Sequence, residues 1–384
     1  MRRGPMRIGL LATTRRYEDS FLGPAERLFE ASGANLGNFA FVEALWRQLQ
    51  PDVVILPWHV SRAEARERCD LLVFAAANQL GSHTDLGDLA TQLEATGLPV
   101  VAVGLGAQSA SLAQPPRLTG GTERWVRTLA ALAPTARPNI AVRGEFTRRT
   151  LERLGLSDRA VTLGCPSNFL NSRPDFYASL SAKASRGRVE RLCVAAGSRH
   201  FASTREVERR LVRLVAATGG AYVVQSDIEF LRFARGETLA PAEREAIRAY
   251  LAPDLSPDAL DLWRRRHASA FADATSWLDA MHGFDFAVGA RIHGVMLPIQ
   301  AGVPGGVVAH DSRTLELCQT MGVPVRLPHE IPENFAAEDL PKLFDFDVAT
   351  FAATRERLRR VYVEFLRGCG IEPDARLTTL QAPP

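Results

Sequence analysis

The residues best suited to chemistry are Arg291 and His293, which are separated by one residue and bracketed by Gly289 and Gly294. A guanidinium can bind a carboxylate or a phosphate through two parallel hydrogen bonds, and an imidazole gains or loses a proton near neutral pH. Glycines let the backbone approach a ligand closely, and free N–H groups at a helix start attract anions. Either residue alone is more often a surface ion-pair partner or an ordinary helix-start histidine. Together they predict an anion-binding site with an acid–base group.

The surrounding pattern predicts how these two residues are positioned. Residues 284–288 form an apolar run fit for a buried strand, residues 295–301 predict a short apolar helix, and residues 303–309 predict a second strand. This order of elements is a βαβ unit with Arg291 and His293 on the turn that leaves the first strand. Ligands bind at that edge of an open α/β sheet.

Arg143 repeats this placement in the first half of the chain, because it follows a predicted strand at residues 140–142 and precedes a predicted helix at residues 145–154. Two such arginines could hold one dianionic ligand between them. The alternative is a salt bridge from Arg143 to Glu145 or to a neighbouring carboxylate.

Other candidates are less distinctive. Asp311 is a third catalytic candidate, which could orient His293, bind a substrate hydroxyl, or only cap the helix that begins near Arg313. A further set stands at predicted helix starts or strand ends, where polar groups could contact substrate: Gly33, Asn35, Gly37, Asn38, Asn168, Arg199, Gly294 and Arg313. The first four precede a predicted helix and could cradle a ligand with backbone N–H groups or only cap that helix.

Strand and helix signals alternate along most of the chain, which predicts mostly parallel sheets covered by helices. The first set has predicted strands at residues 7–12, 53–56, 71–75, 99–103, 140–142 and 161–163. Residues 171–188 show no apolar periodicity and predict a linker. A second set follows, with strands at residues 191–196 and 221–224 around a helix at residues 203–217, in which Ser203 and Glu206 have capping-box spacing. Residues 236–280 look like a charged helical insertion, and residues 351–366 predict a terminal helix.

Composition sets the broad class. The chain has 384 residues, 46% of them hydrophobic and 23% charged, so a soluble protein with two hydrophobic cores is expected. The net charge of +3 is too even to favour nucleic acid. Five scattered cysteines form no C-x-x-C pair, which disfavours a disulfide framework or a zinc site. The short apolar run at residues 8–12 is neither a signal peptide nor a membrane span. A cytoplasmic enzyme that needs no metal is therefore expected.

The stretch GARIHGVMLPIQAGVPGGVVAHDSR, at residues 289–313, resembles a motif of the polysaccharide pyruvyl transferase family and carries most of the resemblance. Further matches are GANLGNFAF (33–41), VGLGAQ (103–108), NIAVRGEFTRRTLERLG (139–155) and LGCPSNFL (163–170). The resemblance therefore extends from about residue 33 to about residue 322.

The resemblance implies an α/β fold of two doubly wound Rossmann-like domains that face each other across a cleft, the glycosyltransferase-B-like architecture. Residues 1–180 would form an N-terminal domain on the acceptor side and residues 190–350 a C-terminal domain on the donor side. Residues 351–384 would form a helix that packs back on the N-terminal domain, and a tail.

The resemblance also implies transfer of a pyruvyl group from phosphoenolpyruvate to a sugar of an exopolysaccharide or cell-surface polysaccharide precursor, with a pyruvate ketal as product. The partners would be phosphoenolpyruvate, with no other cofactor, and a sugar or lipid-linked oligosaccharide, which could bring the protein to the inner face of the membrane. Whether residues 33–38 contact donor or acceptor stays open. Fold does not fix function, so two alternatives remain: a nucleotide-sugar glycosyltransferase or epimerase, with Glu316 on the ribose, and a non-catalytic carbohydrate-binding protein.

Overall fold

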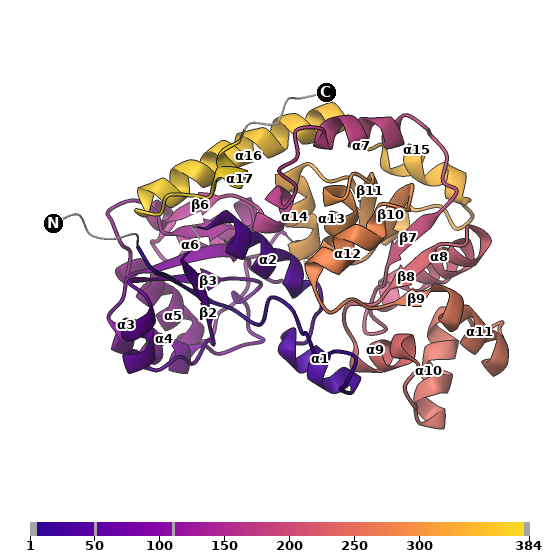
Figure 1. Ribbon diagram of the computed structural model, residues 1–384, viewed down its shortest axis with the longest axis horizontal. Helices are drawn as coiled ribbons and strands as arrows, with labels where there is room; N and C mark the ends of the chain where they lie inside the picture. Colours follow the sequence, from indigo (N-terminus) through magenta and orange to yellow (C-terminus); the bar gives the residue numbers. More distant parts are fainter. Residues whose placement is uncertain (1–5, 50–51, 110–111, 380–384) are drawn as a thin grey trace.

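The computed structural model describes residues 6–49, 52–109 and 112–379. Within them the chain forms two six-stranded sheets, in which every pair of neighbouring strands is parallel. Each sheet is flanked by helices, and the two sheets lie in separate lobes (Figure 1). The predicted fold class of two doubly wound Rossmann-like domains facing across a cleft is confirmed.

The first sheet has the strand order β2-β1-β3-β4-β5-β6. Its strands are β1 (Ile8–Leu11), β2 (Val53–Leu56), β3 (Leu71–Ala75), β4 (Val100–Leu105), β5 (Ile140–Val142) and β6 (Ala160–Thr162). The helices of this half are α1 (Ala25–Ala31), α2 (Asn38–Gln48), α3 (Arg62–Arg68), α4 (Gly87–Thr96), α5 (Gly120–Ala131) and α6 (Glu145–Glu152). All the residues of β1, β3, β4 and β5 are buried, because helices cover both faces.

The second sheet has the strand order β12-β11-β10-β7-β8-β9. Its strands are β7 (Leu192–Ala195), β8 (Ala221–Val223), β9 (Ala268–Ser269), β10 (Phe286–Gly289), β11 (Gly305–Val308) and β12 (Val325–Arg326). Its helices are α8 (Arg205–Ala217), α9 (Ile228–Arg235), α10 (Pro241–Leu251), α11 (Pro257–His267), α12 (Ala274–Met281), α13 (Ile292–Gln300), α14 (Ser312–Met321) and α15 (Leu340–Phe344). The order of strands reverses between β7 and β10, the point where ligands bind in such sheets.

Three local predictions were wrong. The predicted linker contains helix α7 (Phe176–Ala184), which buries Phe176, Tyr177 and Leu180, three side chains too widely mixed with small residues to give a clear period. Helix α8 begins at Arg205 after a short 3-10 turn, so its N-cap is Thr204 and Ser203 forms no capping box. The block at residues 236–280 is more than an insertion, because it supplies the edge strand β9.

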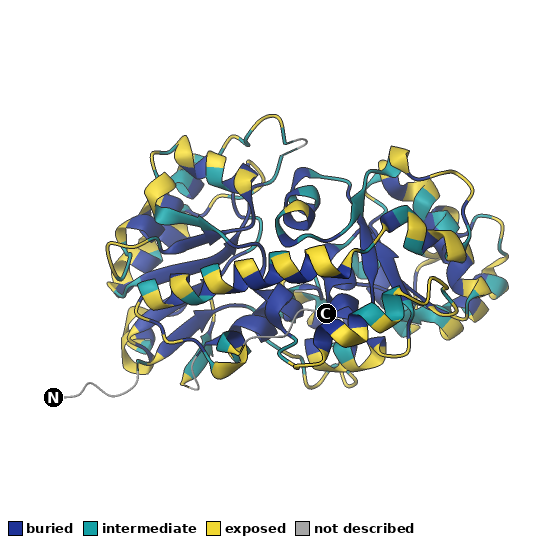
Figure 2. Cartoon of the chain, turned by 90° about the horizontal axis from the view of Figure 1, so that it is seen from above, coloured by how far each residue is buried: buried dark blue, intermediate teal, exposed yellow. Residues whose placement is uncertain are grey.

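The C-terminal helix α16 (Val348–Gly368) runs along both lobes and is followed by α17 (Ala375–Thr378). Figure 2 shows it as a long helix whose outer face is exposed and whose inner face is buried. Helix α16 packs against α7 and α14, and α17 packs against α2. At its centre Arg355 is buried and donates hydrogen bonds to the carbonyl oxygen of Asn168 at 2.6 Å and the hydroxyl of Tyr177 at 3.1 Å. The helix thus ties together segments from both halves of the chain.

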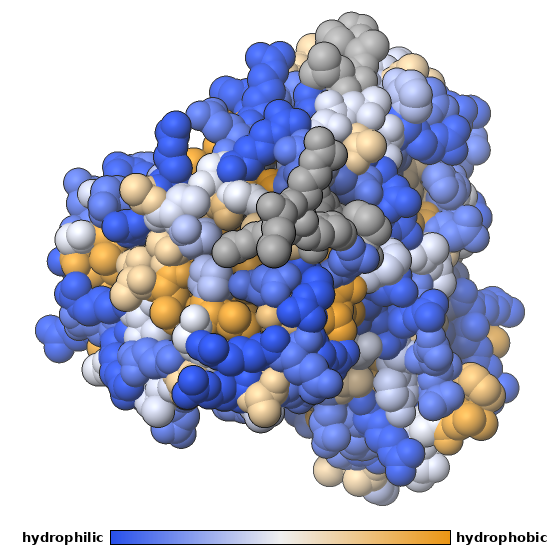
Figure 3. All heavy atoms as spheres, turned by 60° about the vertical axis from the view of Figure 1, so that its left-hand side comes forward, coloured by the Kyte–Doolittle hydropathy of each residue, from blue (hydrophilic) through white to orange (hydrophobic). Residues whose placement is uncertain are grey.

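The outer surface is mostly hydrophilic on the face that Figure 3 shows. Few large hydrophobic side chains are exposed among the described residues: Phe21, Leu22, Trp46 and Leu262. Among the described residues no helix combines the length and the apolar character needed to cross a membrane.

Candidate active site

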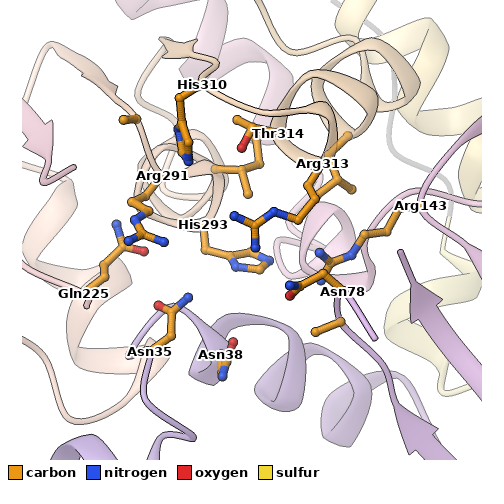
Figure 4. Close-up of a pocket in the computed structure, with 14 residues that line it drawn as sticks. Asn35, Asn38, Asn78, Arg143, Gln225, Arg291, His293, His310, Arg313 and Thr314 are labelled. Atoms are coloured by element: carbon orange, nitrogen blue, oxygen red, sulfur yellow. The ribbon is translucent and has the colours of Figure 1, made fainter. Parts of the chain in front are cut away.

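A pocket lies between the two halves of the molecule, at the carboxyl ends of the strands, and is called the interdomain pocket below (Figure 4). Its volume is about 60 Å³. The N-terminal half lines it with Asn35, Asn38, Ala77, Asn78 and Arg143, and the C-terminal half with Gln225, Ala290, Arg291, Ile292, His293, His310, Arg313, Thr314 and Leu317. Most of these residues follow a strand or begin a helix, which is why a parallel sheet brings them to one edge.

The pocket carries an excess of buried positive charge. Arg143 is 5% exposed, and its Nε donates to the carbonyl oxygen of Gly104 at 2.9 Å. The predicted alternative of a bridge to Glu145 is wrong, because Glu145 pairs with Arg148. Within the described residues neither Arg143 nor Arg291 has a carboxylate within ion-pair distance, and the buried Nε of Arg291 has no hydrogen-bond partner. Burial lowers the pKa of both guanidiniums. Arg143 is buried and Arg291 half-buried, and two such cations without an ion-pair partner favour an anionic ligand.

His293 lies in the first turn of α13, after Arg291 as N-cap residue, so the helix begins earlier than the sequence predicts. Its Nε2 is 3.4 Å from the Sγ of Cys165, which also accepts a hydrogen bond from the Ser167 hydroxyl at 3.0 Å. Burial keeps Cys165 a thiol by raising its pKa. Since the Ser167 hydroxyl already donates to this sulfur, the thiol hydrogen can point to Nε2. This favours the imidazole tautomer with its proton on Nδ1.

The imidazole of His293 is neutral at physiological pH in this structure. Burial, with a smaller contribution from the charge of Arg143, lowers its pKa to about 3. The cation that acts on this pKa is Arg143, in the other half of the chain, rather than Arg291, which is only two residues away in the sequence. An anion bound between the two would offset this field and raise the pKa.

The turn before α2 presents two amides to the pocket. Gly33 and Ala34 adopt positive φ values of 66° and 61°, which sets the sharp turn. The Oδ1 of Asn35 accepts from the N–H of Gly37, and the Nδ2 of Asn38 donates to the carbonyl oxygen of Ser32, both at 2.9 Å. The remaining amide atoms of the two asparagines make no hydrogen bond to the described residues. These side chains therefore cap the turn and also line the pocket. The two alternatives for this motif, a capping role and a ligand-binding role, are compatible.

Gly37 lets the two halves of the chain approach closely at the pocket, and Gly294 lets α13 approach Gln225 within the second half. A Cβ on Gly37 would come within 2.7 Å of the Gln225 Oε1 and 3.1 Å of the His293 Cβ. A Cβ on Gly294 would meet the Gln225 Nε2 at 2.1 Å. Both positions therefore need glycine because of packing, and neither supplies a side-chain contact to a ligand.

Four of the candidates do not line the interdomain pocket. Asp311 caps α14 by accepting from the N–H of Thr314 and pairs with Arg313, so it does not line the pocket. Arg199 pairs with Glu229 at 2.6 Å, and Asn168 lies buried in a 3-10 turn, with both polar atoms of its side chain unpaired. Gly33 lies behind the amides of the turn and lines a neighbouring pocket.

The sequence analysis missed several pocket residues: Asn78, Gln225, His310 and Thr314. His310 has the largest potential for chemistry. Its side chain is 1% exposed, its ring lies 4.0 Å from that of Phe201, and neither ring nitrogen has a hydrogen-bond partner. Burial lowers its pKa to about 4. His310 could have been found from its position after the predicted strand, since Arg143 and Arg291 were identified from the same placement at a strand end.

The depressed pKa of His293 predicts an acid-dependent loss of stability. Between pH 6.5, the ordinary value for histidine, and pH 3, the unfolded chain binds a proton here that the folded protein excludes. The free energy of unfolding should therefore fall as the pH falls, by about 1.4 kcal/mol per pH unit below 6.5. His293→Gln should remove this term. We expect urea unfolding to show the wild type losing about 2 kcal/mol more than the variant between pH 7 and pH 5.

The exposed His329 offers a matched control. His329→Gln should lose stability in acid as the wild type does. An acid loss in His293→Gln equal to that of the wild type would show that His293 is not held neutral by the fold.

Comparison with known proteins adds a family and a set of structures. The family model described as "Polysaccharide pyruvyl transferase" matches residues 35–312. No curated protein matches the chain.

Several solved structures are similar at low identity. The S. aureus MnaA structure with UDP is 11% identical, over 97% of this chain and 99% of that chain, with a TM-score of 0.44. A UDP-N-acetylglucosamine 2-epimerase from Rickettsia bellii is 11% identical, over 95% and 98%, with a TM-score of 0.39. The wall teichoic acid polymerase TagF is 9% identical, over 96% and 90%, with a TM-score of 0.45. Similarities of this size say nothing about what this protein binds.

Proposed function

Because the chain belongs to the polysaccharide pyruvyl transferase family, we propose that it transfers a pyruvyl group from phosphoenolpyruvate to a sugar of an exopolysaccharide or cell-surface polysaccharide precursor, forming a pyruvate ketal. The observation that carries the choice of donor is a pair of arginines on opposite walls of one pocket, the buried Arg143 and the half-buried Arg291, neither of which has a carboxylate partner among the described residues. Phosphoenolpyruvate has two anionic groups, a phosphate and a carboxylate, and each suits a guanidinium.

The reaction fixes what the site must supply. Carbon 2 of the donor forms bonds to two sugar oxygens, and its bond to the phosphate oxygen breaks. The two hydroxyl protons balance the reaction: one converts the methylene carbon into a methyl group, and the other leaves with the phosphate. The site therefore needs cationic contacts that hold the donor and at least one group that delivers and takes up protons.

In the proposed mechanism the arginines hold the donor, and the free N–H groups at the start of α13 add to the same field. His293 gives the proton to the methylene carbon. Although it is neutral in the empty pocket, the incoming anion raises its pKa, so proton uptake accompanies donor binding. His310, the second imidazole of the pocket, replaces Asp311 as the next group to test for removal of a hydroxyl proton, because Asp311 is occupied by α14 and Arg313.

In the alternative of a nucleotide-sugar enzyme, Glu316 was expected to bind the ribose, and its side chain is already engaged. Both oxygens of Glu316 accept hydrogen bonds from Thr147, from its N–H at 2.6 Å and from its hydroxyl at 2.8 Å. These bonds join α14 to α6, so Glu316 serves contact between the two halves of the protein. The non-catalytic alternative predicts sugar binding without release of phosphate from phosphoenolpyruvate.

We further propose that the protein acts in the cytoplasm on a sugar or lipid-linked oligosaccharide, at the inner face of the membrane in the second case. No cofactor besides the donor enters the proposed reaction. Protonation and charge neutralisation are supplied by the histidine and arginine side chains.

Phosphate release tests the function. The purified protein should release phosphate from phosphoenolpyruvate only when a suitable sugar-nucleotide or lipid-linked acceptor from a panel is present. Phosphoenolpyruvate alone should raise the melting temperature, since a ligand that binds only the folded state stabilises it. Stabilisation by UDP or GDP with no effect of phosphoenolpyruvate would favour the nucleotide-sugar alternative.

Replacement of Arg291 by lysine tests the geometry of the donor site. The variant keeps the charge but loses the planar pair of donors, so donor affinity should fall about tenfold, the equivalent of roughly one charged hydrogen bond. Isothermal titration with phosphoenolpyruvate measures this. Arg199→Lys, at a neighbouring arginine that pairs with Glu229, is the matched control and should bind the donor normally. Unchanged affinity in Arg291→Lys would remove Arg291 from the donor contacts.

A further inference from the structure

A second pocket opens beside the interdomain pocket and is formed only by the first half of the chain. Its volume is about 380 Å³, and its lining residues lie between Thr13 and Leu86. Four residues line both pockets: Asn35, Asn38, Ala77 and Asn78. The two pockets therefore adjoin along this group, and the second is called the N-terminal pocket below.

The two pockets differ in charge and size. Three arginines line the interdomain pocket, whereas no Asp, Glu, Lys or Arg of the described residues lines the N-terminal pocket. The N-terminal pocket is also the larger, at about 380 Å³ against about 60 Å³. The charge of the interdomain pocket suits a compact anion, and the size and neutral lining of the N-terminal pocket suit a larger uncharged ligand.

The walls of the N-terminal pocket combine an aromatic surface with amide groups. Trp58 is half-buried and packs against Phe74 with ring centroids 5.1 Å apart, which fixes the indole in place. Gln79 is 7% exposed, and its Oε1 accepts from the N–H of Ala77 at 2.6 Å, so its NH₂ group is left as a donor. An apolar ring face with neutral hydrogen-bonding groups suits a pyranose, which has C–H faces and a rim of hydroxyls.

The boundary between the pockets offers hydrogen-bond acceptors. Asn78 donates its Nδ2 to the Oε1 of Gln108 at 2.7 Å, and Asn38 donates its Nδ2 to the turn before α2. In both amides the Oδ1 has no hydrogen bond to the described residues. A sugar hydroxyl at the boundary can donate its hydrogen to one of these amide oxygens. The lone pairs of the hydroxyl oxygen are then free to face phosphoenolpyruvate held by the arginines.

We propose that the N-terminal pocket is the acceptor subsite and that it binds an uncharged pyranose ring against Trp58, with two hydroxyls directed past Asn38 and Asn78 toward the interdomain pocket. The role as acceptor subsite rests on the proposed function. Binding of a pyranose does not, and it can be measured separately. Under this proposal Asn35 and Asn38 lie between donor and acceptor, so the turn at residues 33–38 contacts both.

The test uses the methyl pyranosides of glucose, galactose, mannose and N-acetylglucosamine, observed by saturation-transfer difference NMR with the full-length protein. At least one should give a saturable signal with the wild type. Trp58→Ala should lose that signal and bind phosphoenolpyruvate as the wild type does. Trp46→Ala, which removes an exposed tryptophan outside both pockets, should keep the signal.

Each outcome either supports or overturns the acceptor subsite. No pyranoside signal with the wild type, or an equal signal with Trp58→Ala, overturns the subsite. If Trp58→Ala does not fold, Thr84→Arg keeps the Trp58–Phe74 contact and fills the pocket with a long cation, and must abolish the signal. Pyranoside binding through Trp58 without binding of phosphoenolpyruvate keeps the subsite and rejects pyruvyl transfer. If Trp58→Ala binds phosphoenolpyruvate and releases phosphate as the wild type does, the proposed function stands and the acceptor subsite is rejected.

Discussion

Replacement of His293 by glutamine is expected to lower the turnover number by about 10²- to 10⁴-fold, the usual contribution of general acid–base catalysis. Glutamine keeps a hydrogen-bonding head that can still contact the Sγ of Cys165, but it cannot exchange a proton. Donor affinity should stay within a few-fold of the wild type, because the arginines and the helix start remain. Steady-state kinetics of phosphate release, with donor affinity from titration, separate the two effects.

The pH dependence sharpens this test. In the empty pocket burial and Arg143 hold the pKa of His293 at about 3, and a bound donor should move it upward. Donor binding should therefore take up a proton, seen as a dependence of the binding heat on the ionisation heat of the buffer. His293→Gln should bind without this uptake, whereas His329→Gln should behave as the wild type. Near-normal turnover in His293→Gln would reject the acid–base role, and His310 would then be replaced in the same way.

Replacement of Arg143 by alanine is expected to weaken phosphoenolpyruvate binding by about 10- to 100-fold, because charge-assisted hydrogen bonds contribute roughly 1.5–3 kcal/mol. The same change should not lower stability in proportion. Arg143 is a buried cation with no ion pair among the described residues, and only its Nε contacts the Gly104 carbonyl. Its removal relieves a desolvation cost, which offsets the packing that is lost. Loss of affinity with little change in melting temperature is the expected combination.

Arg148 provides the control for Arg143. It lies on α6, one turn beyond Arg143, and pairs on the surface with Glu145. Arg148→Ala should leave donor affinity unchanged, because Arg148 is outside the pocket. It should also change the stability little, because exposed ion pairs contribute little to stability. If Arg143→Ala lowers the melting temperature strongly but binds the donor normally, Arg143 is a structural residue and the proposed donor site loses one wall.

The sequence by itself determined the class of fold and the neighbourhood of the site. Strands such as those at Leu71–Ala75 and Ile140–Val142 were predicted at their observed bounds, because a strand buried on both faces is a short apolar run with clear breaks. Parallel strands expose their carboxyl ends at one edge of a sheet, so a polar residue after such a run can be assigned to that edge from local pattern alone. Arg143, Arg291 and His293 were found in this way.

Tertiary structure decided which of the strand-end residues share a pocket. Asp311 and Arg199 occupy the same kind of position as Arg291, but Asp311 caps α14, which was one of the alternatives left open by the sequence, and Arg199 pairs with Glu229, which the sequence does not single out. Gln225, Asn78 and His310 reach the pocket because of how the two domains meet, a contact between segments more than a hundred residues apart. The low pKa of His293 is also decided by tertiary structure, because burial and the charge of Arg143 come from neighbours in space rather than in sequence.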